Sequence, residues 1–160
     1  MSRRKAREIV LCLVFEKDYR TDCSCEKLYN DLFEDGGIDI EEIYDSFGED
    51  ESEKNKNKNK NDYLSKADRN YIKSTFIGIY ENIEQIDDIV SSSTIGWEYN
   101  RISKISMALL RIAVYEILHA EDVPTSVAIN EAVELSKRYD DSEAYTFING
   151  VLGAVVKNNK

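Results

Sequence analysis

Four cations near the start of the chain form a pattern suited to binding phosphate: Arg3, Arg4, Lys5 and Arg7. An apolar run follows at residues 9–15, which is typical of a helix that begins around Ser2. The positive end of the helix macrodipole makes each cation in a first turn unfavourable by about 0.3–1 kcal/mol. We expect the three arginines to share a face that buries nothing, because the apolar run starts after it. The pattern therefore predicts a phosphate-binding patch, to which backbone N–H groups add donors. An ordinary solvated basic terminus is the alternative.

The net charge of the chain is −10, but the charge is unevenly spread. Residues 1–20 carry six bases and three acids, whereas residues 21–62 carry five bases and fourteen acids. The overall acidity argues against a nucleic-acid partner, whereas the cations concentrated in the first twenty residues are compatible with one.

Residues that could perform catalysis are few. The chain lacks the glycine-rich phosphate-binding motifs and has a single histidine, His119, expected as a favourable cation at a helix C-terminus. Two pairs of adjacent carboxylates, Asp87–Asp88 and Asp140–Asp141, would point about 100° apart on a helix, so we expect solvated or capping roles. We therefore predict no enzyme, no metal site and no cofactor.

Three cysteines and the absence of long apolar stretches indicate the compartment. Cys12, Cys23 and Cys25 are an odd number, which favours reduced thiols. No apolar run approaches the length of a membrane span, and no signal-peptide pattern is present. We expect a soluble, cytoplasmic protein with no membrane partner.

The elements that position these residues are predicted to be helices throughout. Only one proline and seven glycines interrupt the chain, and no stretch alternates with a period of two. Ser65 and Asp68 are typical of a capping box before an apolar seam. The seam has spacings of 4-3-4-3-4: Ile72, Phe76, Ile79, Ile83, Ile86 and Val90. Residues 105–118 are apolar on nearly every side, which predicts a buried central helix. A weaker helix is expected around residues 28–33, ending at Gly36–Gly37.

The C-terminal part predicts two further helices. Pro124 cannot lie inside a helix, so the chain is expected to turn there and restart. The next helix should bury Ala128, Ala132, Leu135 and Tyr139. The last helix, capped by Asp141 or Ser142, should bury Ile148, Val151, Leu152 and Val155. Its two glycines, Gly150 and Gly153, are expected to permit a close backbone approach, because each costs about 1 kcal/mol relative to alanine.

Residues 49–62 form the only low-complexity stretch, where lysine and asparagine alternate without an apolar residue. Nothing there can be buried to offset the entropy of ordering, so we expect a solvated loop insert. The chain is interpreted as a single domain over residues 1–160.

Four segments together resemble the NusB family of bacterial transcription antitermination factors. They are RRKARE (3–8), LLRIAVYEIL (109–118), DVPTSVAINEAVELSKRY (122–139) and FINGVL (147–152). The resemblance implies an all-α fold with about seven helices in two packed halves. It also implies binding to the boxA element of nascent ribosomal RNA together with NusE, a small-subunit ribosomal protein. Such an assembly would keep RNA polymerase processive without chemistry of its own.

Site residues follow from the same resemblance. The RNA-binding positions would be Arg3, Arg4, Lys5 and Arg7, with Asp122 and Pro124 near the RNA surface. Asn130, Glu131, Asn149 and Gly150 match signature positions, either as structural ties between the last two helices or as RNA-proximal residues. Arg111 and Glu116 are expected to stabilise the fold.

Several alternatives stay open at this point. A helical protein–protein adaptor without direct RNA contact would explain the overall acidity, but it would leave the cations of residues 3–7 unexplained. The same domain also occurs fused to ribosomal RNA methyltransferases, and 160 residues leave no room for a methyl-donor-binding domain. A homodimer is one alternative for the oligomeric state.

Overall fold

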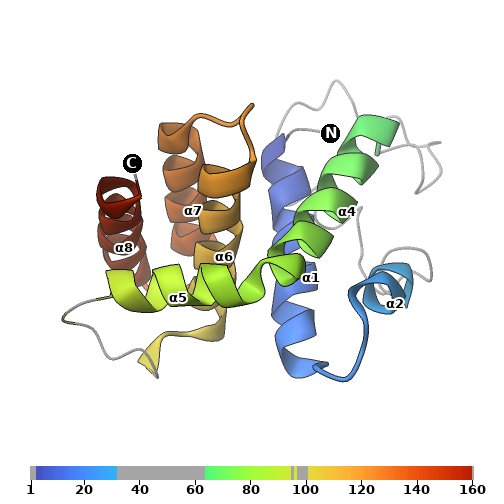
Figure 1. Ribbon diagram of the computed structural model, residues 1–160, viewed down its shortest axis with the longest axis horizontal. Coiled ribbons are helices and arrows are strands. Elements are labelled where there is room, and N and C mark those ends of the chain that lie inside the picture. Colours follow the sequence, from blue (N-terminus) through green and yellow to red (C-terminus); the bar gives the residue numbers. More distant parts are fainter. Residues whose placement is uncertain (1–2, 32–63, 95, 97–100, 160) are drawn as a thin grey trace. The chain divides into compact units, whose positions relative to one another are not determined.

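Helices make up the regular structure of every part of the chain that the computed structural model describes, namely residues 3–31, 64–94, 96 and 101–159 (Figure 1). Seven helices and no strand occur in these ranges, which confirms the predicted all-α class. The chain divides into two compact units, residues 1–76 and 77–160. The predicted insert at residues 49–62, the expected end of the weak helix at Gly36–Gly37, and Ser2 lie outside the described residues.

The first unit contains helix α1 (Arg3–Tyr19), helix α2 (Cys25–Tyr29) and most of helix α4 (Lys66–Glu81). Its interior is formed by apolar residues of all three helices that are fully shielded from solvent: Ile9, Val10, Leu13, Leu28, Ile72 and Phe76. Helix α2 is capped by Ser24, whose hydroxyl accepts a hydrogen bond from the Lys27 amide at 3.1 Å.

Helix α4 begins with the predicted capping box. The amide of Asp68 donates to the Ser65 hydroxyl at 3.1 Å, and the amide of Ser65 donates to the Asp68 carboxylate at 3.0 Å. Two backbone N–H groups that the first turn leaves without helical acceptors are therefore satisfied by side chains.

The apolar seam after Ser65 was predicted as one helix, and this prediction is wrong in one respect. The helix ends at Glu81 and a new helix, α5 (Ile83–Ser93), starts after Asn82. The side-chain amide of Asn82 donates to the Gly78 carbonyl at 2.8 Å. Asparagine competes for backbone acceptors in this way, which favours a break. Most of the seam is buried as expected, whereas Ile83, next to the break, is half-buried.

The second unit contains α5, α6 (Lys104–His119), α7 (Thr125–Tyr139) and α8 (Ala144–Asn158). Helices α6, α7 and α8 lie side by side, and α5 packs against α6 and α8 (Figure 1). The predicted central helix is confirmed as α6, whose buried residues include Leu109, Leu110, Ile112 and Val114. Among the described residues, no helix is long and apolar enough to cross a membrane.

Helices α7 and α8 follow the predicted boundaries closely. Pro124 directly precedes α7, and the Asp141 carboxylate accepts hydrogen bonds from the amides of Glu143 and Ala144, both at 3.0 Å, at the start of α8. The expectation that Tyr139 is buried is wrong, because its side chain stands at the last residue of α7 and is 39% exposed.

Two glycine positions in the second unit behave in opposite ways. A Cβ atom at Gly78 would lie only 2.6 Å from Cζ of Tyr115, so any larger residue there would force the Tyr115 ring to shift. At Gly150 and Gly153 a Cβ atom would meet nothing within 4 Å. The predicted close backbone approach at these two residues is therefore wrong within this chain, because both lie on an exposed face of α8.

Candidate nucleic-acid interface

The first turn of α1 carries the predicted cations, but the structure divides them by exposure. Arg3 is exposed and Arg4 is half-buried, whereas Lys5 and Arg7 are only 3% and 4% exposed. The expectation that the face of the three arginines buries nothing is therefore wrong for Arg7. The buried part of the helix was expected to begin with the apolar run at residue 9, but the buried residues already begin at residue 5.

An aromatic ring explains part of this burial. The Arg3 Cζ atom lies 4.1 Å from the centroid of the Tyr71 ring on α4, and the Arg7 Cζ atom lies 6.0 Å from the same centroid. Both distances are within the range of cation–π attraction. The sequence pattern does not single out Tyr71, because Tyr71 precedes Ile72 of the apolar seam and contributes nothing to the periodicity.

The electrostatics of this helix start favour an anionic partner. The first turn of α1 contains no acidic residue, and Arg3, Arg4 and Lys5 occupy the positive end of the macrodipole. Unlike a carboxylate, the tyrosine ring does not neutralise the positive charge of Arg3. The exposed arginine and the helix N-terminus can therefore attract phosphate together.

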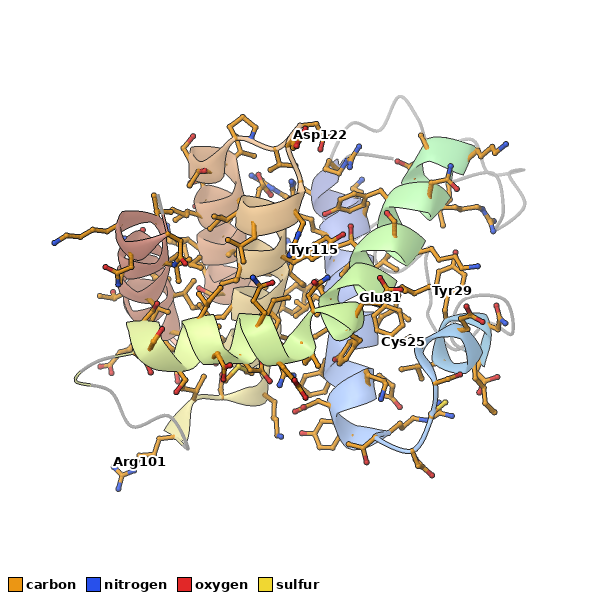
Figure 2. All side chains as sticks on the ribbon, in the orientation of Figure 1. Cys25, Tyr29, Glu81, Arg101, Tyr115 and Asp122 are labelled. Atoms are coloured by element: carbon orange, nitrogen blue, oxygen red, sulfur yellow. The ribbon has the colours of Figure 1, made fainter. Side chains whose placement is uncertain are left out.

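The second predicted segment belongs to the other unit and lies between α6 and α7. Asp122, labelled in Figure 2, and Pro124 are exposed. The Val123 amide donates to the Ala120 carbonyl at 3.1 Å in the turn. The predicted turn and restart at Pro124 are confirmed. The turn offers a carboxylate and a rigid proline ring, so it brings no positive charge of its own.

The signature residues of α7 and α8 lie largely at the surface. Asn130, Asn149 and Gly150 are exposed, and Glu131 is half-buried. Helices α7 and α8 pack against each other, and both have buried apolar residues, among them Leu135 on α7 and Leu152 on α8.

Two polar contacts stabilise the second unit. Arg111 donates two hydrogen bonds to Asp87, from Nε at 2.9 Å and from Nη2 at 3.1 Å, which joins α6 to α5 as expected for a fold-stabilising residue. The Ser103 and Ser106 hydroxyls donate to one Asp140 oxygen at 2.7 and 2.6 Å. Burial acts to raise the pKa of Asp140, but these hydrogen bonds outweigh it and hold the pKa below its ordinary value.

Reactive side chains do not gather in the described part of the chain. No group of three or more histidine, cysteine, aspartate or glutamate residues there could hold a metal ion. All three cysteines are free thiols, as expected. Burial, together with the nearby Glu8 charge, raises the pKa of Cys12 to about 11, so its thiol is a poor nucleophile at neutral pH.

Comparison with known proteins places these observations in a family. The NusB family model matches residues 37–157. The chain is 40% identical over 162 residues to the transcription antitermination protein NusB of Clostridium perfringens (strain SM101), covering 100% of both chains. It is 38% identical over 157 residues to the protein of the same name from Acetivibrio thermocellus, covering 98% of this chain and 90% of the relative.

Solved structures show the same fold. NusB of T. maritima superposes with a TM-score of 0.72 at 30% identity, covering 98% of this chain and 92% of that one. A crystal structure of the antitermination factors NusB and NusE in complex with double-stranded RNA matches with a TM-score of 0.65 at 23% identity, covering 98% and 96%.

Fold and site together define an all-helical protein of two units whose first helix begins with exposed positive charge. The matches extend over nearly the whole chain at up to 40% identity. This chain belongs to the NusB family.

Proposed function

We propose that this chain is a transcription antitermination factor that binds boxA-type RNA of nascent ribosomal RNA transcripts together with NusE. The complex would nucleate an antitermination assembly that keeps RNA polymerase processive. Family membership supports the general role, since the curated relatives carry the name transcription antitermination protein. The solved complex of NusB and NusE with RNA supports the two partners.

The observation that carries the RNA part of the proposal is the positive start of α1. Arg3 and Arg4 keep solvent access, lie in a first turn without acids, and can contact phosphate directly. Lys5 and Arg7 are buried, so we assign them to the positive field of the site and to holding the helix start. Direct contact with phosphate falls to Arg3 and Arg4.

The other proposed RNA-proximal residues are the exposed turn of Asp122 and Pro124 and the signature residues of α7 and α8. Because Asp122 is acidic and Pro124 carries no charge, the contribution of this turn would be shape and hydrogen bonding rather than attraction of phosphate. Among the signature residues, Asn149 and Gly150 are exposed on α8 and accessible to a partner. Their substitution should weaken assembly without changing its salt dependence.

Copurification of this protein with purified NusE, with and without a boxA-type RNA, tests the proposal. We expect NusE to be retained by the protein and retained more strongly when the RNA is present. A scrambled RNA of the same length and charge is the matched control and should give less enhancement. Equal retention with the boxA-type and scrambled RNAs would contradict boxA recognition.

The strong acidity of the remaining chain favours a second candidate, a protein–protein adaptor that does not touch RNA. The net charge is −10 although the first twenty residues contribute +3, so the rest of the chain carries −13, most of it in residues 21–62. Under this alternative, NusE retention would be unaffected by RNA of either sequence. The protein alone would then show no RNA affinity that falls with salt.

A further inference from the structure

The Tyr71 ring approaches two arginines of α1 at once. Arg3 and Arg7 stand four residues apart and therefore on the same side of the helix. Their Cζ atoms lie 4.1 Å and 6.0 Å from the ring centroid. One tyrosine of α4 thus faces the part of the first helix where the proposed RNA contacts begin.

A ring holds a guanidinium group differently from a carboxylate. All five N–H donors of arginine lie in the plane of the guanidinium, whereas cation–π attraction acts through its face. A carboxylate partner would occupy donors and neutralise the charge. Contact with an aromatic ring restricts the side chain and leaves both the donors and the charge available to another anion.

Exposure distinguishes the two arginines. Arg3 is exposed, Tyr71 is half-buried and Arg7 is 4% exposed. The half-buried ring therefore lies next to a solvent-facing arginine. Arginine loses considerable rotamer freedom when it is ordered, and this loss weakens binding unless it occurs before the partner arrives.

We propose that Tyr71 is a positioning residue that holds the Arg3 guanidinium ready for contact with RNA phosphate. This inference rests on the proposed function, because it assumes that Arg3 binds RNA. Tyr71 acts through Arg3 and need not touch the RNA itself. The tyrosine hydroxyl has no part in the mechanism, so phenylalanine should replace it.

Two substitutions separate positioning from simple packing. Tyr71→Phe keeps the ring and should retain RNA affinity within about twofold of the unchanged protein. Tyr71→Met replaces the ring by a flexible apolar chain and should weaken binding of a boxA-type RNA about three- to tenfold. Tyr19→Leu is the matched control, because Tyr19 is a 61% exposed tyrosine at the other end of α1, and it should leave affinity unchanged.

A double-mutant cycle with Arg3→Gln gives the decisive comparison. Once Arg3 is replaced, Tyr71→Met should cost little further affinity, because the group it positions is gone. An equal loss with and without Arg3 would overturn the proposal and assign Tyr71 to packing. The same conclusion would follow if Tyr71→Phe weakened binding as much as Tyr71→Met.

A measurement without RNA covers the case in which Tyr71→Met does not fold. The Arg3 side-chain protons should show an upfield ring-current shift by NMR in the unchanged protein and in Tyr71→Phe. Absence of this shift would overturn the positioning role. If Arg3→Gln leaves RNA affinity unchanged, the proposed RNA contact of Arg3 is wrong. If Arg3→Gln weakens RNA binding but Tyr71→Met does not, the positioning role of Tyr71 is wrong and the proposed function stands.

Discussion

Helices α1 and α4 belong largely to the same unit and begin in opposite ways. At the start of α4, Ser65 and Asp68 exchange two hydrogen bonds with each other's backbone amides. The first turn of α1 contains three cations and no acid. The first arrangement satisfies the helix end from the local sequence, whereas the second opposes the helix dipole.

The difference shows where each helix start obtains its stability. A capping box is local, so α4 needs no distant residue to fix its first turn. At the start of α1 the Tyr71 ring of α4 lies near Arg3 and Arg7 instead, and Lys5 and Arg7 are buried. Those contacts do not explain why Arg3 is exposed and charged. We propose that its charge serves to bind an external anion.

The largest expected effect on stability concerns Arg7. Its side chain is 4% exposed, so replacement by glutamine removes a buried charged group from contacts that hold the first turn. We expect Arg7→Gln to lower the free energy of unfolding by about 1–3 kcal/mol, measured by urea denaturation. A stability equal to that of the unchanged protein would contradict the tertiary support assigned to α1.

The second prediction concerns Gly150 and Gly153 of α8. Glycine lowers helix propensity, and no close contact in the described structure offsets this loss. A Cβ atom at Gly150 or Gly153 meets nothing, so alanine should gain helix propensity without a clash. The double alanine variant should raise the free energy of unfolding by about 2 kcal/mol. Gly78→Ala is the matched contrast and should destabilise, because its Cβ would overlap the Tyr115 ring. A destabilised double variant would show that α8 packs against something at these positions.

The third prediction concerns the capping box of α4. Ser65→Ala removes the acceptor for the Asp68 amide and should cost about 1 kcal/mol. Thermal and denaturant unfolding both report this change, and RNA affinity should be unaffected. Comparison with Ser74→Ala, at an exposed position within the same helix, shows whether the loss belongs to the cap. Equal effects of the two substitutions would remove the contrast between α4 and α1.

The smallest expected effect on stability concerns Arg3. Its replacement by glutamine relieves an unfavourable dipole interaction of about 0.3–1 kcal/mol and removes a cation–π contact of about 0.5–1 kcal/mol. These opposite effects should leave the free energy of unfolding within about 0.5 kcal/mol of the unchanged protein. A large loss would indicate that Arg3 is a structural residue like Arg7.

Local patterns in the sequence predicted much of the fold. The Ser65–Asp68 box, the turn at Pro124, and the buried seam from Ile72 to Val90 follow from capping, proline geometry and helical periodicity. The break at Asn82 was missed because the seam continues through it with unchanged spacing. A side-chain amide bonding to a carbonyl four residues earlier leaves no trace in hydrophobic periodicity.

The candidate site was predicted less completely, because burial at α1 depends on tertiary contacts. Arg7 looks the same as Arg3 in a sequence, and the Tyr71 ring lies near both, so only the burial of Arg7 separates them. At the two glycines of α8 the sequence instead predicted a contact that the described structure does not have. Their spacing predicted close packing, but a pattern of small residues does not reveal which face of a helix lies against the protein.

The central claim is that Arg3 and Arg4, the two arginines at the start of α1 that keep solvent access, bind RNA phosphates. Its most direct test is the affinity of the Arg3→Gln, Arg4→Gln double variant for a boxA-type RNA across a series of salt concentrations. We expect weaker binding, and a slope of log affinity against log salt that is shallower by about 0.7 for each lost contact on single-stranded RNA. NusE affinity in the absence of RNA should stay unchanged. A folded variant with the affinity and salt slope of the unchanged protein would contradict the account.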